Sequence, residues 1–459
     1  MTVTQEAPAR QIPVVRGIPV FGSALEMGKD PAAFLVRAYR EHGPVFRMRL
    51  LNQTYTVIAG PDAANFMGSR EGRDCLRSKE FWQGMVDEYG GTRTLTGEDG
   101  ESHRELRELM RRGYSRDAIK GRVPELIEIT DRVLERDWKA GTTVPVVQNM
   151  QYLVTEQLGE ILTGSAPREY VPDIRLLTLY VLNVLVTRQR PRILLKDPRY
   201  RKAKARVFEL ADRMAADLRA RAGRTPDEDR ILVEDIMAAH LERPGVVPAE
   251  DLTMTLTGPY VAGLDTVANT TASFVYAVLK HPEVLARIRA EADELFGATK
   301  KDGASPISDD DVRRLPAVRY ALMETMRLYP VAVTLVRTAA RDFEFAGHTI
   351  REGEMVYVAT SVPHFMEEYF PEPQMFDIGR YAKPRAEHLR PGAYSPYGRG
   401  PHTCLGKSFA DVQMALSMAR LFHRLDLELE SPGYTLRTRT APTPGPATSF
   451  KIRVKGYRN

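Results

Sequence analysis

The chain has very few cysteines and no long hydrophobic run. Two cysteines among 459 residues exclude a disulfide framework and a four-cysteine zinc site, so a cysteine that carries chemistry would act alone. No segment approaches the roughly 18 to 20 apolar residues that span a bilayer. Residues 1–11 lack the basic-then-apolar order of a signal peptide. We therefore expect a cytoplasmic protein with no membrane span.

Neither sign of charge is in large excess. Lysine and arginine total 65 against 60 acidic residues, and this formal charge of +5 is too small a surplus to indicate a nucleic-acid partner. Hydrophobic residues make up 43% and charged residues 27%, as in ordinary globular proteins, which argues against a disordered chain. No period of about 20 to 50 residues repeats, so solenoids and propellers are disfavoured.

Helical periodicity dominates the middle of the chain. Apolar residues recur three and four positions apart through most of residues 100–296, which is typical of helices with one buried face. The pattern predicts helices at Glu101–Tyr114, Arg116–Trp138, Gln148–Leu162, Arg168–Val186, Pro198–Ala222, Ile231–Leu241, Ala249–Lys280 and Pro282–Phe296. Outside this region it predicts helices at Pro31–Glu41, 316–329 and Lys407–Arg424.

Short β-like runs come from both ends of the chain. They lie at Val45–Leu50, Tyr55–Ala59, Leu335–Ala339, Asp342–Phe345, Thr349–Ile350 and Met355–Ala359. No stretch between these parts has the composition of a linker. The sequence therefore predicts a mainly α protein with small β-sheets, formed by one domain over residues 1–459, with residues 1–12 as a flexible tail.

One glycine-rich passage contains a cysteine directly before a predicted helix. Two phosphate-binding patterns fail there, because a dinucleotide fingerprint would need glycine at Thr403 and a P-loop ending at Gly406 would need glycine at Pro401. With both patterns excluded, the passage is a cysteine-containing loop before a helix. The positive end of that helix and nearby backbone N–H groups would favour a thiolate at Cys404. A thiolate held in this way suits a haem iron. The alternative is a small buried apolar residue, which most lone cysteines are.

The spacing around this cysteine is that of a known family. Tyr397, Gly400, Cys404 and Gly406 fit the pattern F-x-x-G-x-x-x-C-x-G, and the passage resembles the cytochrome P-450 superfamily. Tyrosine at the first position keeps an aromatic ring beside the sulfur but adds a hydroxyl group. The resemblance implies the single haem-thiolate monooxygenase fold and haem b as cofactor. It also implies that Cys404 ligates the iron and that Tyr397, Gly398 and Gly406 contact the cofactor.

A second pattern lies in the middle of the longest predicted helix. Glycine within a helix costs about 1 kcal/mol relative to alanine, and Gly263 beside Ala262 would let a ligand lie against the helix. Asp265 and Thr266 then supply a carboxylate and a hydroxyl group for proton delivery, and they resemble the family's acid–alcohol pair. The alternative is a packing glycine beside a solvated aspartate. Pro259, about one turn earlier, would kink or split this helix.

A third pattern places opposite charges three residues apart. Glu324 and Arg327 share one predicted helical face, and as a surface pair they would contribute at most a few tenths of a kcal/mol. The resemblance instead makes them the family's buried E-x-x-R pair, joined by Arg380 from the F-x-x-x-R segment that begins at Phe376. Such a network would fix the fold around the cysteine loop rather than take part in catalysis.

The resemblance also assigns cationic and apolar positions. Haem propionates bind cationic donors, and the family's spacing implies four such residues, each of which could otherwise be a surface charge: His103, Arg107, Arg337 and His402. A lipophilic substrate would contact apolar side chains that equally suit ordinary core packing: Phe81, Trp82, Met85, Val331 and Val333.

The activity that the resemblance implies is insertion of one oxygen atom from dioxygen into a C–H or C=C bond of a lipophilic small molecule. Electrons would come from NAD(P)H through a separate ferredoxin or flavodoxin with its reductase, because too few residues follow Leu425 for a flavin or iron–sulfur domain. We expect a monomer. A basic docking face for the partner is predicted at Arg104, Arg111, Arg112, Arg399 and Lys407. A peroxide-driven peroxygenase and a haem-binding sensor are the alternatives, and the acid–alcohol pair argues against both.

Overall fold

A computed structural model describes residues 11–298 and 306–458 and divides them into two compact units. Unit 1 contains the described residues up to 81 together with 332–375 and 386–403, and unit 2 contains 82–331, 376–385 and the residues from 404 onwards, within the described ranges. The predicted tail at residues 1–12 lies almost wholly outside the described residues. One haem-binding domain over residues 1–459 stays a prediction.

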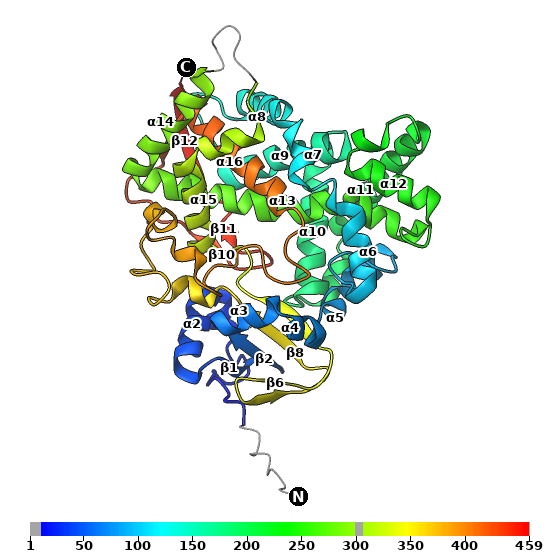
Figure 1. The fold of residues 1–459 in the computed structure, drawn as a ribbon, viewed down its shortest axis with the longest axis vertical. Helices are drawn as coiled ribbons and strands as arrows, with labels where there is room; N and C mark the ends of the chain where they lie inside the picture. Colours follow the sequence, from blue (N-terminus) through cyan, green and yellow to red (C-terminus); the bar gives the residue numbers. More distant parts are fainter. Residues whose placement is uncertain (1–10, 299–305, 459) are drawn as a thin grey trace, which may run out of the picture. The chain divides into compact units, whose positions relative to one another are not determined.

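Unit 1 is built around a five-stranded sheet (Figure 1). Its strand order is β1 (Val45–Leu50), β2 (Gln53–Ala59), β8 (Met355–Ala359), β5 (Leu335–Ala339) and β3 (Leu76–Arg77). The remaining elements of unit 1 are α1 (Ala24–Lys29), α2 (Pro31–His42), α3 (Pro61–Gly68), α4 (Arg70–Cys75), β6 (Phe343–Phe345), β7 (His348–Ile350), η7 (Val362–Phe365) and η9 (Glu387–Leu389). Strand β2 pairs with β8 in parallel, so the sheet joins segments from distant parts of the chain.

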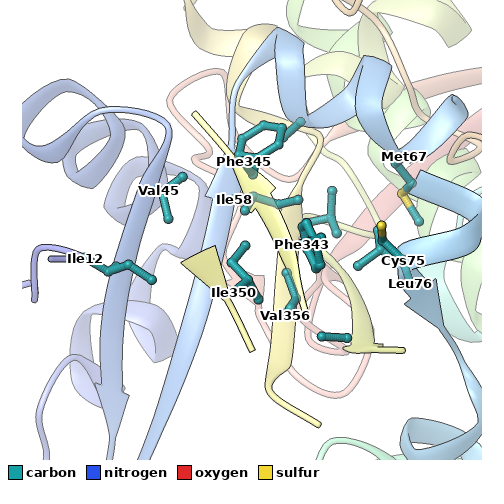
Figure 2. Close-up of a cluster of buried hydrophobic side chains, with 13 residues drawn as sticks. Ile12, Val45, Ile58, Met67, Cys75, Leu76, Phe343, Phe345, Ile350 and Val356 are labelled. Atoms are coloured by element: carbon teal, nitrogen blue, oxygen red, sulfur yellow. The ribbon is translucent and has the colours of Figure 1, made fainter. Parts of the chain in front are cut away.

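Apolar side chains from these elements form a core on the sheet (Figure 2). Phe343, Ile350 and Val356 pack there with Ile58 from β2, and each is less than one-tenth exposed. Cys75 is 1% exposed within the same cluster. Cys75, the cysteine outside the glycine-rich passage, is therefore a core residue, which is the usual role of a lone cysteine.

Unit 2 is mainly helical (Figure 1). Its α-helices are α6 (Gly100–Arg111), α7 (Arg116–Lys120), α8 (Val123–Asp137), α9 (Val146–Leu158), α10 (Val171–Tyr180), α11 (Pro198–Arg221), α12 (Leu232–Glu242), α13 (Ala249–Lys280), α14 (Pro282–Ala298), α15 (Pro316–Leu328) and α16 (Lys407–Arg424). Helix α5 (Lys79–Tyr89) crosses the division between the units. The 3-10 and π-helical turns of unit 2 are η1 (Gly159–Thr163), η2 (Arg168–Tyr170), η3 (Val181–Val186), η4 (Arg192–Lys196), η5 (Asp227–Asp229), η6 (Asp309–Arg314) and η8 (Ile378–Tyr381).

Two small sheets complete unit 2. One has the order β4 (Thr143–Pro145), β12 (Lys451–Tyr457) and β9 (Leu425–Leu429). The other is the antiparallel pair of β10 (Thr438–Arg439) and β11 (Gly445–Pro446), which packs against α13. The predicted mainly α architecture with small β-sheets is confirmed.

Most predicted helices lie where the periodicity placed them, with one clear exception. The predicted helix Arg116–Trp138 is two helices, because Gly121 ends α7 and Pro124 stands in the first turn of α8. Pro259 does not split α13, which runs unbroken from Ala249 to Lys280. This helix packs against α9, α10, α15 and α16, so tertiary packing outweighs the hydrogen bond that proline removes.

Candidate functional site

Cys404 lies in the loop that leads into α16, whose N-cap is Gly406. The residue is exposed to solvent, but protein atoms also crowd its sulfur, and this burial raises the pKa of the thiol. The Gly406 N–H, which hydrogen-bonds to the sulfur, and the Arg107 charge lower the pKa by less. The backbone N–H therefore acts in the expected direction, toward thiolate, while desolvation of the sulfur opposes it and is the larger effect. Ligation would remove the proton instead, since a thiol bound to a metal ion is deprotonated.

Helix α6 brings a cation within electrostatic range of this sulfur. Burial lowers the pKa of the Arg107 guanidinium, and the Cys404 charge partly opposes that effect. His103, one turn earlier on the same face of α6, is only 2% exposed. The structure thus places both predicted residues of α6 in unit 2 with Cys404, and it brings Arg107 within electrostatic reach of the sulfur.

Tyr114 is a neighbour of the cysteine that the sequence did not reveal. A Cβ atom built on Gly406 would stand 3.6 Å from its ring carbon Cδ1. Burial, together with the charge of Cys404, raises the pKa of the Tyr114 hydroxyl. Tyr114 follows α6 and belongs to none of the patterns that identified the other residues, so only the folded chain places it here.

The residues of the cysteine loop up to Thr403 belong to unit 1. Gly400 has φ +76°, and a Cβ atom there would lie 2.5 Å from the carbonyl oxygen of Met67, so only glycine permits this approach of two backbone segments. His402 Nε2 lies 3.3 Å from the hydroxyl oxygen of Ser78, another partner that no pattern revealed. Tyr397 is partly buried, and Gly398 has φ +72°.

Arg337 is on β5 of unit 1. Only 7% of the residue is exposed, and its Nη1 donates a hydrogen bond of 2.8 Å to the carbonyl oxygen of Val336. Burying a guanidinium is costly unless an anion or further acceptors lie near it. The anion-binding role of Arg337 stays a prediction.

Helix α13 exposes one narrow strip in the middle of its length. Ala262 is exposed although buried residues precede and follow it, and Thr266, one turn later, is partly exposed. The Thr266 hydroxyl donates a hydrogen bond of 2.8 Å to the Ala262 carbonyl oxygen. Gly263 points elsewhere, since a Cβ atom on it would stand 2.5 Å from Cδ1 of Leu158 on α9. Close packing with α9 thus accounts for the glycine, whereas Ala262 is the small residue on the open side.

Asp265 is buried and held by residues that the sequence did not reveal. Only 5% of it is exposed, so the alternative of a solvated aspartate is wrong. Gln151 on α9 donates a hydrogen bond of 2.7 Å from Nε2 to Asp265 Oδ1. The Nη2 atom of Arg439 on β10 lies 3.8 Å from the same oxygen. Both partners are distant in sequence and stand outside any motif.

Glu324 is the centre of a buried polar network in unit 2. Its Oε1 accepts hydrogen bonds from Arg327 Nη2 at 2.8 Å, from the Asp377 N–H at 3.0 Å and from Arg380 Nε at 3.1 Å. Its Oε2 accepts from Arg327 Nε at 2.8 Å and from the Tyr381 hydroxyl at 2.7 Å. Glu324, Arg327 and Arg380 are each at most 1% exposed. The structure therefore brings the three predicted members together and adds Asp377 and Tyr381.

The predicted substrate residues are partly or fully buried. Met85 is 6% and Val333 7% exposed, and the other three are of intermediate exposure: Phe81, Trp82 and Val331. Such burial is also what ordinary core packing requires. These residues divide between the units, with Phe81 and Val333 in unit 1 and the other three in unit 2.

Most of the basic residues predicted to dock a redox partner form ion pairs with acidic neighbours. The pairs are Arg104–Glu101, Arg111–Glu108, Arg112–Asp235 and Lys407–Asp411. Arg399 instead donates to the Ser395 hydroxyl at 2.6 Å. Because the four pairs are neutral as units, this set of residues has little net positive charge.

Comparison with known proteins identifies the family. A cytochrome P450 family model matches residues 12–442. The chain belongs to the cytochrome P450 family. Cyclooctat-9-en-7-ol 5-monooxygenase of Streptomyces melanosporofaciens is 28% identical to this P450 over 440 residues, covering 91% of this chain and 90% of the relative. Sterol 14alpha-demethylase of Mycolicibacterium vanbaalenii is 26% identical over 449 residues, covering 94% of each chain.

Solved structures agree on the fold of this P450. Retinoic acid-bound cyanobacterial CYP120A1 has a TM-score of 0.80 and 22% sequence identity, covering 96% of this chain and 98% of its own. The heme domain of cytochrome P450DA has a TM-score of 0.80 and 20% identity, covering 97% of each chain. Within the described residues of this P450, no helix combines the length and apolar character that crossing a membrane requires.

Family membership confirms haem b with an axial cysteine thiolate as the cofactor of this P450 and makes it an oxidoreductase of the monooxygenase type. The described side chains fit that cofactor chemically. A thiol with a backbone N–H on its sulfur and a guanidinium within electrostatic range is suited to bind iron as thiolate, because both groups stabilise negative charge. Cationic side chains on α6 and β5 are suited to propionates.

Proposed function

We propose that this P450 binds haem iron through Cys404 and inserts one oxygen atom from dioxygen into a C–H or C=C bond of a lipophilic small molecule. The observation that carries the proposal is the Cys404 sulfur, with the Gly406 N–H bonded to it and the Arg107 charge within electrostatic range of it. When bound, the haem supplies the activation of dioxygen and the transfer of its oxygen atom. The tasks of the protein are to hold the cofactor, exclude competing reactions and manage protons.

Four cationic or polar side chains are proposed to hold the haem propionates: His103, Arg107, Arg337 and His402. Arg337 is almost fully buried and Arg107 partly so, and a charge pair in such a place is less screened by salt than one in open solvent. The hydrogen bond to the Val336 carbonyl oxygen orients the Arg337 guanidinium before an anion arrives. Tyr397, Gly398 and Gly406 are proposed to line the cofactor through the backbone and ring of the cysteine loop.

Proton delivery is proposed to use the exposed strip of α13. The Thr266 hydroxyl already donates to the Ala262 carbonyl oxygen, so its lone pairs remain to accept a hydrogen bond beside the open Ala262 position. Asp265, the residue before Thr266 on the helix, supplies a carboxylate that can pass protons to this strip. The intact pair favours an enzyme driven by dioxygen over one driven by peroxide, which has less need of a proton relay.

The proposed substrate is a lipophilic compound with alicyclic rings. The names of two relatives refer to a cyclooctatenol and a sterol, and one neighbouring structure contains retinoic acid. The apolar side chains at Met85, Val331 and Val333 would suit such a surface. Electrons are proposed to come from NAD(P)H through a separate ferredoxin or flavodoxin with its reductase.

A spectral titration tests the site and the substrate class together. Purified ferric protein would be titrated with a sterol, a cyclic terpene alcohol, retinoic acid, a fatty acid and a macrolide while the Soret band is followed. A low-spin thiolate spectrum that shifts to shorter wavelength only with the cyclic lipophiles supports the proposal. A shift confined to the fatty acid or the macrolide would overturn the substrate class. If Cys404→Ala keeps the thiolate spectrum unchanged, Cys404 is not the ligand of the haem iron.

Turnover of a responsive compound separates the classes of activity. Product with reduced ferredoxin and dioxygen supports the monooxygenase. Product only with hydrogen peroxide would make the protein a peroxygenase, and ligand binding without product under either condition would favour a sensor.

A further inference from the structure

The carboxylate of Asp265 sits in a polar network that connects α13 to the β10–β11 hairpin. Gln151 donates to its Oδ1, and Arg439 Nη2 lies 3.8 Å from the same atom. Both interactions involve Oδ1, and neither involves the other carboxylate oxygen, Oδ2. The two partners thus hold one oxygen of the carboxylate and leave the other for exchange of a proton.

Asn269 holds Arg439 in this place. It lies one turn after Asp265 on α13, and its Oδ1 accepts a hydrogen bond of 3.0 Å from Arg439 Nη2. Its Nδ2 donates to the Pro444 carbonyl oxygen at 3.3 Å, next to β11. A Cβ atom built on Gly445 would stand only 2.4 Å from Asn269 Cγ, so the second strand of the hairpin also packs on this side chain. One amide therefore fixes both ends of the hairpin loop to the helix.

The charge of Arg439 is not needed for this attachment. Burial lowers the pKa of the Arg439 guanidinium, the charge of Asp265 raises it, and Arg175 lowers it further. Placing a guanidinium where burial and a second arginine both disfavour its charge is costly. A neutral donor could bond to Asn269 equally well, so the cost of the cation indicates a role toward the nearby carboxylate.

We propose that Arg439 is a positioning residue for proton delivery, which keeps the Asp265 carboxylate against Gln151 and turned so that Oδ2 serves the exposed strip at Thr266. The inference rests on the proposed function, because the orientation of Asp265 matters only if that strip is the site of proton delivery. At 3.8 Å the guanidinium acts on Asp265 through its charge, and Asn269 sets where that charge stands. The hairpin thereby supports a group on α13 that belongs to a different part of the sequence.

Two substitutions of one residue and a matched control test the proposal in the haem-loaded protein. Arg439→Gln removes the charge and keeps a donor for Asn269, whereas Arg439→Lys keeps the charge. Arg437→Gln is the control, because Arg437 is an exposed arginine two positions earlier on the same segment. The readouts are the fraction of NAD(P)H electrons recovered in product and the infrared bands of the Asp265 carboxylate, isolated by difference from Asp265→Asn.

The expected result is specific to the charge at position 439. A positioned acid or base typically contributes about 10²–10⁴ in rate, and we expect loss of its positioning to lower coupling about tenfold in Arg439→Gln. Arg439→Lys should recover most of the coupling, and Arg437→Gln should match the unmodified protein. The carboxylate bands should shift in Arg439→Gln and remain in place in Arg437→Gln, a readout that does not depend on turnover.

Two outcomes overturn the inference. If Arg439→Gln keeps its coupling and its carboxylate bands, Arg439 does not position Asp265. If Arg439→Lys fails as badly as Arg439→Gln while both melt earlier, the residue is structural only. Failure of the proposed function looks different, because the unmodified protein would then lack either the thiolate-type carbonyl spectrum or product formation with reduced ferredoxin.

Discussion

Replacement of Glu324 by alanine should destabilise this P450 strongly, because one carboxylate compensates two buried arginines. The substitution removes five hydrogen-bond acceptor contacts and leaves Arg327 and Arg380, each at most 1% exposed, without that anion. Breaking a buried ion pair by removing one partner costs about 3–5 kcal/mol. With an unfolding entropy of roughly 2 cal/mol/K per residue, a loss of about 4 kcal/mol lowers the melting temperature of a chain of this length by about 4 °C.

A surface pair of the same spacing is the matched control. Glu108 and Arg111 also lie three residues apart on a helix and approach to 2.7 Å, but their side chains are 70% and 66% exposed. Glu108→Ala should therefore change the free energy of unfolding far less than Glu324→Ala does, because solvent screens the pair. Urea unfolding followed by circular dichroism would give both free energies of unfolding, with Glu324→Gln as a milder variant should Glu324→Ala not fold. If the free energies of unfolding of Glu324→Ala and Glu108→Ala differ by less than about 1 kcal/mol, the burial argument is refuted.

Further predictions concern the cysteine loop and the oxygen-site helix. Thr266→Ala should lower the coupling of electron consumption to product while substrate binding is kept, and unchanged coupling in a product assay would place proton delivery elsewhere. Because burial raises the pKa of the Cys404 thiol, iron must displace a proton, so haem affinity of the apoprotein should rise with pH by up to about tenfold per unit below that pKa. Haem titration of Cys404→Ala should lack this slope. Gly400→Ala should cost about 1–3 kcal/mol through its positive φ and the Met67 carbonyl oxygen, whereas Gly433→Ala, with open space around it, should cost far less in thermal melts.

Elements whose cause is local could be predicted from the sequence. Helix α16 at Lys407–Arg424 and strand β5 at Leu335–Ala339 follow from periodicity alone, and the structure has the same bounds. The spacing around Cys404 was enough to predict the family, because the loop and the following helix are contiguous in the chain. Helix ends were less predictable, since the break at Gly121 depends on turn chemistry that competes with a continuous apolar pattern.

The surroundings of each candidate residue, in contrast, depend on how distant parts of the chain pack together. Asp265 receives its hydrogen bond from Gln151, 114 positions away, and Asn269 receives one from Arg439, 170 positions away. Periodicity carries no information about such partners, because it reports the face of one helix and not what packs on it. The same holds for the Cys404 thiol, whose pKa is raised by burial although its own loop supplies an N–H that lowers it. Desolvation is a property of the assembled protein, and no local pattern encodes it.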